Sequence, residues 1–178
     1  NGEEVSTEAY NERLSLLLNQ SYPAAYLSVL VGLLFVVILW GEQEHQRLVT
    51  WYFCIVLTAA MRIFIYLSSR STPPHEPPVS RREKLYRVTT LSYFAVWGLG
   101  GLWVIQGVPL LDKVIALYFL IGLAGSAISV FSASRFLQLG AILILVVPFI
   151  LWFLAMGGVK PVVMAAAGAM FLISAVRS

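Results

Sequence analysis

Six continuous apolar stretches, separated by short polar segments, occupy most of the chain. They cover residues 24–40, 48–67, 88–105, 114–131, 136–156 and 160–176. A helix needs about 20 apolar residues to cross the hydrocarbon core of a bilayer, within a range of about 17–25. Strands of a membrane barrel would instead alternate apolar and polar positions. The pattern predicts an all-α integral membrane protein whose core is a bundle of six transmembrane helices.

A polar segment, residues 1–22, precedes the predicted membrane domain at 23–178. Within residues 7–20 the apolar side chains recur at helical spacing: Tyr10, Leu14, Leu17 and Leu18. One apolar face predicts an amphipathic helix that lies in the membrane interface. The alternative is a simple extension of the first span. Pro23 favours a separate helix start, because proline is tolerated in a first turn.

Basic residues gather on one side of the predicted membrane. With the N-terminus inside, eight of the twelve fall on the inner side: Arg13, Arg70, Arg81, Arg82, Lys84, Arg87, Arg135 and Arg177. Three fall outside: Arg47, Lys113 and Lys160. This positive-inside bias predicts that both termini are cytoplasmic. The net charge of +3 is dispersed over span ends, so it indicates topology and not a nucleic-acid partner.

Composition excludes several function classes. Hydrophobic residues make up 59% of the chain and charged residues 12%, against about 25% charged in soluble domains. Cys54 is the single cysteine, which excludes an internal disulfide and a cysteine-based zinc site. His45 and His75 lie between spans, so haem ligation within the bilayer is excluded. Apart from Lys160 at the outer edge of the sixth stretch, no span holds Asp, Glu or Lys for a proton relay. We expect no cofactor, no metal and no catalysis in this segment.

Tryptophan and proline positions add local expectations. Trp40, Trp51, Trp103 and Trp152 lie near the outer ends of spans, as in an interfacial aromatic belt. Four prolines within residues 70–84 predict an extended loop there. Pro148 lies in the middle of the fifth span and predicts a kink.

Arg62 is the one charged residue well inside a span. It lies about 9 Å from the inner end, at 1.5 Å per residue. Its long side chain either extends to the cytoplasmic interface or faces the bundle interior with a partner. Tyr93 and Ser129 lie at similar depth and are possible partners. An inward Arg62 could hold the head group of an acidic lipophilic ligand.

Glycines surround Trp97, which lies near mid-membrane, and recur on the next span. Close helix packing is the simpler interpretation of such small residues. The functional interpretation is a ligand cavity among the second, third and fourth spans. Its candidate residues are Arg62 as polar anchor, Trp97 as wall, Gly101 and Gly125 as space, and Tyr93 and Tyr118 as further contacts.

The chain resembles the six-helix, MASE-type N-terminal membrane modules of bacterial signalling proteins. The matching residues are Glu12-Arg13-Leu14, Gln20-Ser21, Trp51, Arg62, Trp97-Gly98-Leu99-Gly100-Gly101 and Gly122-Leu123-Ala124-Gly125. The resemblance implies a sensor in the bacterial inner membrane and a homodimeric output. It also implies a sixth helix that continues into a diguanylate cyclase (GGDEF), phosphodiesterase (EAL) or histidine-kinase domain, the chain being part of a longer protein.

The leading functional hypothesis is therefore a sensory input domain that detects a lipophilic small molecule, a lipid or a state of the membrane. Two alternatives remain open. A small transporter or channel would need further inward polar groups or an inverted repeat. In a membrane scaffold subunit, all the small-residue motifs would serve packing alone.

Overall fold

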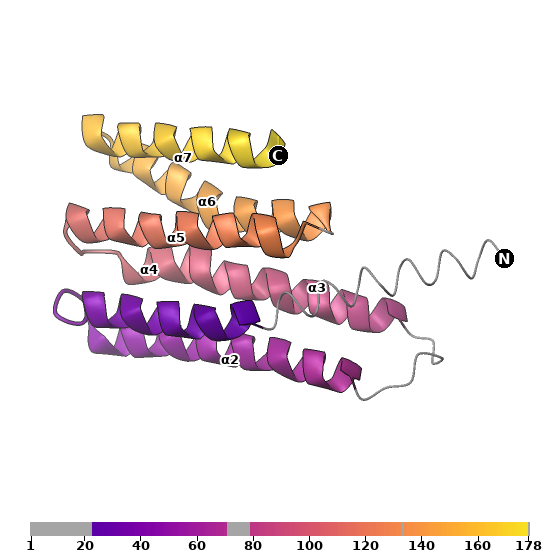
Figure 1. The fold of residues 1–178 in the computed structure, drawn as a ribbon. Coiled ribbons are helices and arrows are strands. Elements are labelled where there is room, and N and C mark those ends of the chain that lie inside the picture. The colour runs from indigo at the N-terminus through magenta and orange to yellow at the C-terminus, as the bar shows by residue number, and fades with distance from the viewer. Residues whose placement is uncertain (1–22, 71–78, 133, 178) are drawn as a thin grey trace.

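A computed structural model describes residues 23–70, 79–132 and 134–177, and in these ranges every regular element is a helix. Six helical rods follow one another in the described chain (Figure 1). They are a first helix (Pro23–Leu39), α2 (His45–Arg70), a third rod made of α3 (Val79–Ala95), the π-helical turn η1 (Val96–Gly100) and α4 (Gly101–Val104), then α5 (Leu110–Val130), α6 (Arg135–Met156) and α7 (Val159–Arg177). The all-α class is confirmed.

Four of these helices, α2, α5, α6 and α7, are long and apolar enough to cross a membrane. The first helix is apolar but shorter. The third rod is apolar only beyond its first turns, and η1 divides it. Length and composition therefore indicate a multi-pass membrane protein. Each rod overlaps one predicted span, and most boundaries differ by only a few residues.

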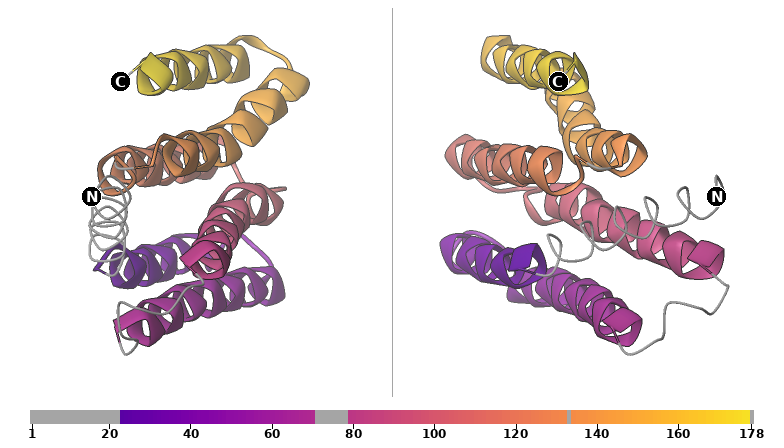
Figure 2. Two further views of the ribbon diagram at one scale, coloured as in Figure 1. Left: turned by 90° about the vertical axis from the view of Figure 1, so that its right-hand side faces the viewer. Right: turned by 45° about the vertical axis from the view of Figure 1, so that its right-hand side comes forward.

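The rods lie roughly side by side, and consecutive rods run in opposite directions (Figures 1 and 2). The third rod packs between α2 and α6, and α6 also packs against α5 and α7. The first helix contacts both α2 and α5 through Phe35, whose ring lies 5.0 Å from Trp51 and 5.8 Å from Phe119. The third rod and α6 therefore form the centre of the bundle, and α7 lies at its edge.

One end of the bundle carries the C-terminus of α2, the N-termini of α3 and α6, and the C-terminus of α7. We call it the basic end, because seven basic residues lie there: Arg70, Arg81, Arg82, Lys84, Arg87, Arg135 and Arg177. At this end the Arg135 guanidinium donates to the Val176 carbonyl at 3.5 Å, which ties the start of α6 to the end of α7.

Tight turns close the opposite end. Gly107, Gly157 and Gly158 have φ values of 88°, 66° and 85°, a region that only glycine adopts without strain. The Gln43 amide donates to the carbonyl oxygens of Val104 and, at 2.8 Å, of Gln106. These bonds satisfy carbonyl groups left free at the end of the third rod.

The aromatic-belt prediction is wrong for Trp51, which is only 2% exposed and packs inside the bundle. Trp40 and Trp103 are exposed near the opposite end, as an interfacial position requires. The prediction rested only on how close each tryptophan is to the end of its span. Whether a side chain contacts lipid or the core depends on the helix face that carries it, and position along the span does not indicate that face.

The prediction of an extended loop over residues 70–84 is wrong at both edges. Helix α2 continues to Arg70, and α3 begins at Val79, directly after the last proline. Proline restricts itself and the residue before it, so it does not prevent a helix from starting after Pro78. Residues 71–78 lie outside the described residues, as does the amphipathic helix predicted within residues 7–20.

Helix α6 contains Pro148 and changes direction along its length (Figure 2). Proline removes one backbone hydrogen bond and its ring presses on the preceding turn, which bends a helix. The bend agrees with the predicted kink. Beyond it, α6 leads away from the third rod towards α7.

Candidate functional site

Arg62 faces the interior of the bundle. It is 5% exposed and lies on the same face of α2 as three buried residues, Trp51, Ile55 and Ala59. Their spacing of four, four and three residues keeps one side of a helix in register. The interpretation in which Arg62 extends to the interface is therefore wrong, and the inward one describes the structure.

Aromatic rings surround the guanidinium. Its central carbon lies 4.9 Å from the ring centre of Tyr93 and 5.9 Å from that of Phe131. Cation–π attraction of this kind grows stronger away from water. Ser129, the other partner considered from depth, is exposed on α5. The rings offset part of the cost of burying the charge but accept no conventional hydrogen bond from it.

Two nitrogens of Arg62, Nε and Nη2, have no hydrogen-bond partner among the described residues. Arg62 also lines a cavity of about 20 Å³, which is room for about one water molecule. The cavity is lined by Ala24 of the first helix, Arg62 of α2, Tyr93 and Phe94 of α3, and Leu123, Ser126, Ala127, Val130 and Phe131 at the end of α5. We call it the Arg62 cavity. Ser126 is also exposed on the surface of the bundle, so the cavity lies close to its outside.

The third rod carries further buried polar groups on one face. Tyr86, Thr90, Tyr93 and Trp97 recur at four, three and four residues, a helical repeat. The Tyr86 hydroxyl, the Thr90 hydroxyl and the Trp97 indole nitrogen are buried, and none has a hydrogen-bond partner in the described part of the chain. Buried polar atoms are normally paired. This face is therefore more polar than a core built for stability alone.

The π-helical turn η1 packs against Trp51. The Trp51 indole nitrogen donates to the Val96 carbonyl at 2.9 Å, and its ring meets Trp97 edge-on at 5.2 Å. A Cβ at Gly100 would lie 2.6 Å from Cδ1 of Trp51, so the indole occupies the space that glycine leaves. Single π turns of this kind are frequent at functional sites.

Gly98 lets the third rod and α6 meet backbone to backbone. A Cβ there would lie 2.4 Å from the Ile144 carbonyl oxygen. Gly101 is buried one turn further on, with the Phe149 ring tip 3.9 Å from where its Cβ would be. For Gly98 and Gly100 the packing interpretation of the glycines therefore describes the structure.

The structure separates the six candidate ligand-site residues. Arg62 and Tyr93 line the same cavity. Trp97 is buried near them but packs on Trp51, and Gly101 lies further along, against Phe149. Two others point out of the bundle: Tyr118 is 80% exposed, and a Cβ at Gly125 would meet nothing within 4 Å.

Sequence reasoning missed the cavity residues of the first helix and α5. Ala24 and Ala127 are small, and Ser126 and Phe131 are ordinary membrane residues. On α5, Leu123, Ala127 and Val130 follow the four- and three-residue repeat of one helix face. That repeat identifies a face, but only the packing shows that it meets Arg62.

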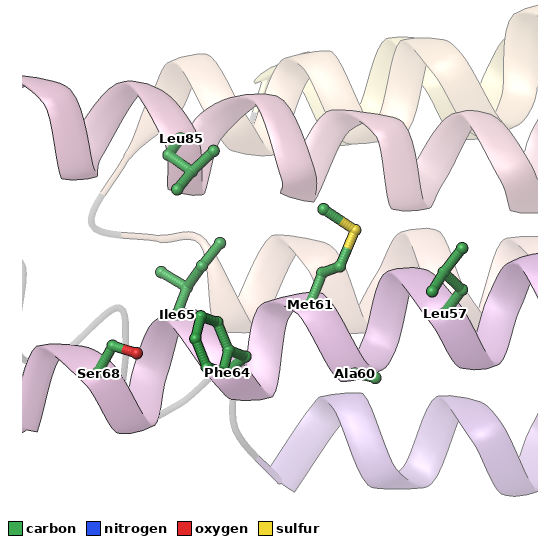
Figure 3. A pocket seen from close by; sticks show the side chains of 7 residues that line it. All are labelled: Leu57, Ala60, Met61, Phe64, Ile65, Ser68 and Leu85. Carbon is green, nitrogen blue, oxygen red and sulfur yellow. The ribbon is translucent and has the colours of Figure 1, made fainter.

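A second hollow, an apolar groove of about 540 Å³, lies between α2 and α3. Figure 3 shows Leu85 of α3 facing Met61 and Ile65 of α2 across it. Its other lining residues are Leu57, Ala60, Phe64 and Ser68. The groove offers one hydroxyl and no charge to orient a ligand. It therefore suits an acyl chain of the surrounding bilayer more than a specific ligand.

The described residues contain no group of His, Cys, Asp or Glu side chains that could hold a metal ion. No protein-family model, no curated protein and no solved structure matches the chain. The resemblance to MASE-type modules accordingly stays a prediction that rests on the residues quoted for it.

Proposed function

We propose that the chain is a membrane-embedded sensory input domain, which detects a lipophilic ligand or a state of the membrane and relays it through α7. One observation carries the proposal: Arg62 is buried beside a cavity, with two nitrogens that no described residue accepts. A charge in this position destabilises the bundle by several kcal/mol unless something pairs with it. Intramembrane charges of this kind are functional candidates by default.

The proposed topology has six spans, both termini in the cytoplasm of a bacterium and the segment before Pro23 in the inner interface. The gathering of seven basic residues at one end supports it, because basic residues favour the cytoplasmic side. Exposed Trp40 and Trp103 at the opposite end fit the outer interface. The linkers between rods at that end are short, which leaves little for a soluble ligand to bind.

A chain of packed elements connects the Arg62 cavity to α7. Tyr93 lies on α3, one turn before η1, and η1 meets α6 where Gly98 touches the Ile144 carbonyl. Helix α7 then packs chiefly on α6, with Gly168 against Ile150. A ligand that prefers one arrangement of these helices shifts the population towards it. In the resemblance, the last helix would pass that shift to paired cyclase, phosphodiesterase or kinase domains.

Distance measurement between spin labels tests the relay. Labels at Ile173→Cys on α7 and Val88→Cys on α3, both at exposed sites, report α7 movement in a Cys54→Ser background. We expect a shift of about 1–2 Å, typical of helix switches, when a C16 fatty acid is added or the bilayer is made thinner. A control pair, Val88→Cys with Phe53→Cys on α2, should stay constant. An unchanged α7 distance in every condition would indicate a static scaffold.

The transporter alternative rests on Arg62 and the bend at Pro148. Against it, Arg62 is the one charged side chain buried among the described residues. A coupled transport path normally needs several such groups. Solute flux in reconstituted vesicles that disappears with Arg62→Ala would favour transport over sensing.

A further inference from the structure

We propose that the Arg62 cavity binds the carboxylate of a single-chain amphiphile, such as a long-chain fatty acid, which reaches it from the bilayer between the first helix and α5. The inference names a ligand class for the proposed sensor. It rests on the proposed function only for the consequence that binding moves α7.

The geometry of the guanidinium points to a carboxylate. Nε and Nη2 lie on the same edge of the group, and both are unpartnered among the described residues. Two donors side by side match the two oxygens of a carboxylate in a bidentate pair. The acidic side chains that the structure describes, Glu42, Glu44 and Asp112, lie at the opposite end. None of these three lies near Arg62, so its charge has no acidic partner in the part of the chain that the structure describes, and we propose that an external anion takes this place.

The route to the cavity lies between two antiparallel helices. The first helix and α5 close on each other where the rings of Phe35 and Phe119 meet at 5.8 Å. Eleven residues away on each helix, towards the basic end, Ala24 and Val130 line the cavity instead. Ser126 lines the same cavity and is exposed on the outside of the bundle. Ser126 therefore marks the side of the cavity closest to the surface of the bundle, and in a membrane this position favours a ligand with a hydrocarbon chain over a free aqueous ion.

Depth and size select among membrane anions. Arg62 lies eight residues before the end of α2 at Arg70, which is about 12 Å at 1.5 Å per residue. The phosphate of a phospholipid lies in the interface, nearer to the end of α2 than Arg62 is. The cavity of about 20 Å³ has room for about one water molecule, so it must widen to admit any anion, and a carboxylate requires less widening than a phosphodiester. A fatty acid can lower a small carboxylate to Arg62 while its chain stays in the bilayer.

Binding to the whole chain in phosphatidylcholine nanodiscs tests the site. The probe is palmitoleate labelled with 13C at its carboxyl carbon, observed by NMR, with stoichiometry from native mass spectrometry. We expect one saturable site whose affinity falls at least about 30-fold in Arg62→Met, since truncating a buried charged partner has an effect of this size. Arg62→Lys, which keeps the charge but loses the two-nitrogen edge, should fall between wild type and Arg62→Met. Equal affinity in wild type and Arg62→Met would overturn the proposal.

Matched variants on α5 locate the binding. Ser126→Leu fills the mouth of the cavity and should weaken binding about tenfold or more. Gly125→Leu adds the same side chain one residue earlier, in open space, and should leave binding unchanged. If Gly125→Leu weakens binding as much as Ser126→Leu, the carboxylate does not bind at the Arg62 cavity.

Matched probes establish the chemistry. Palmitoleate methyl ester, which has the chain without the charge, should not compete, and hexadecyl phosphate should compete more weakly than palmitoleate. Equal competition by the ester, or preference for the phosphate, would overturn the carboxylate assignment. Binding without α7 movement would contradict the proposed sensor but leave the site intact. Movement of α7 on membrane thinning, without carboxylate binding, would contradict the site alone.

Discussion

Two levels of the interface between α2 and the third rod differ in how completely they are filled. At Trp51 the indole nitrogen has an acceptor, the Val96 carbonyl, and its ring fills the space above Gly100. Three turns further along the same face, Arg62 has two unpaired nitrogens among the described residues and a cavity beside it. One helix face thus contains a level closed for packing and a level left open.

The difference has a physical consequence for mutation. At a closed level, added atoms clash and removed atoms break contacts, so almost any change destabilises. At an open level that carries an unpaired charge, removal of the charge relieves a cost. The direction of a stability change therefore distinguishes structural residues from residues kept for binding.

The largest expected effect is at the close contact between the third rod and α6. Gly98→Ala places a methyl group 2.4 Å from the Ile144 carbonyl oxygen, a backbone atom that cannot move alone. We expect a loss of about 3 kcal/mol in the free energy of unfolding, at the upper end for overpacking. Titration with denaturing detergent, followed by circular dichroism, measures it.

Gly122→Ala is the matched control for Gly98→Ala, because a Cβ there meets nothing within 4 Å. It should not lower the unfolding free energy, and should raise it by up to about 1 kcal/mol, because alanine is a better helix former than glycine. Similar losses for the two variants would mean that helix flexibility, and not the contact with α6, sets the cost.

Arg62→Met should stabilise the delipidated protein by about 1–2 kcal/mol, because an apolar chain of similar length replaces a buried unpaired charge. The same titration measures the change. Added palmitoleate should stabilise the wild type alone, and so reduce the difference in unfolding free energy between the two proteins. A clear loss of stability in Arg62→Met would place Arg62 among the structural residues and remove the contrast between the two levels.

The smallest effect compares two buried tryptophans that touch each other. Trp51→Phe removes a hydrogen bond to the Val96 carbonyl, whereas the Trp97 indole nitrogen has no acceptor among the described residues. Both changes replace an indole by a smaller phenyl ring, so their packing losses should be similar. Trp51→Phe should therefore lower the free energy of unfolding by about 1 kcal/mol more than Trp97→Phe. Thermal unfolding of the pair measures the difference, and equal costs would show that the bond adds nothing to stability.

Much of the fold could be predicted from the sequence, because the length and hydropathy of an apolar stretch are enough to identify a membrane helix. The helical rods, their order and the bend at Pro148 agree with the predicted spans. The start of α3 could not be placed, because four prolines in the preceding segment suggested a longer loop. The π turn at Val96–Gly100 could not be predicted from the sequence either, and in the structure it lies where the Trp51 indole nitrogen donates to the Val96 carbonyl.

The candidate site was predictable only at its centre. Arg62 stands out by charge alone and Tyr93 by matching depth, and both line the cavity. Gly125 and Tyr118 point out of the bundle, and Ala24 and Ser126 were missed. In a span that is apolar on every side, hydrophobicity does not indicate which face is buried, because lipid and core are equally apolar.

The sequence by itself determined that the chain forms apolar helices, where they begin and end to within a few residues in most cases, and that one charge lies inside them. Only the tertiary structure decided that this charge faces inward, which helices enclose it, and which glycines serve packing. The physical reason is that hydropathy records the cost of leaving the bilayer, whereas the partner of each helix face depends on side chains far away in the chain.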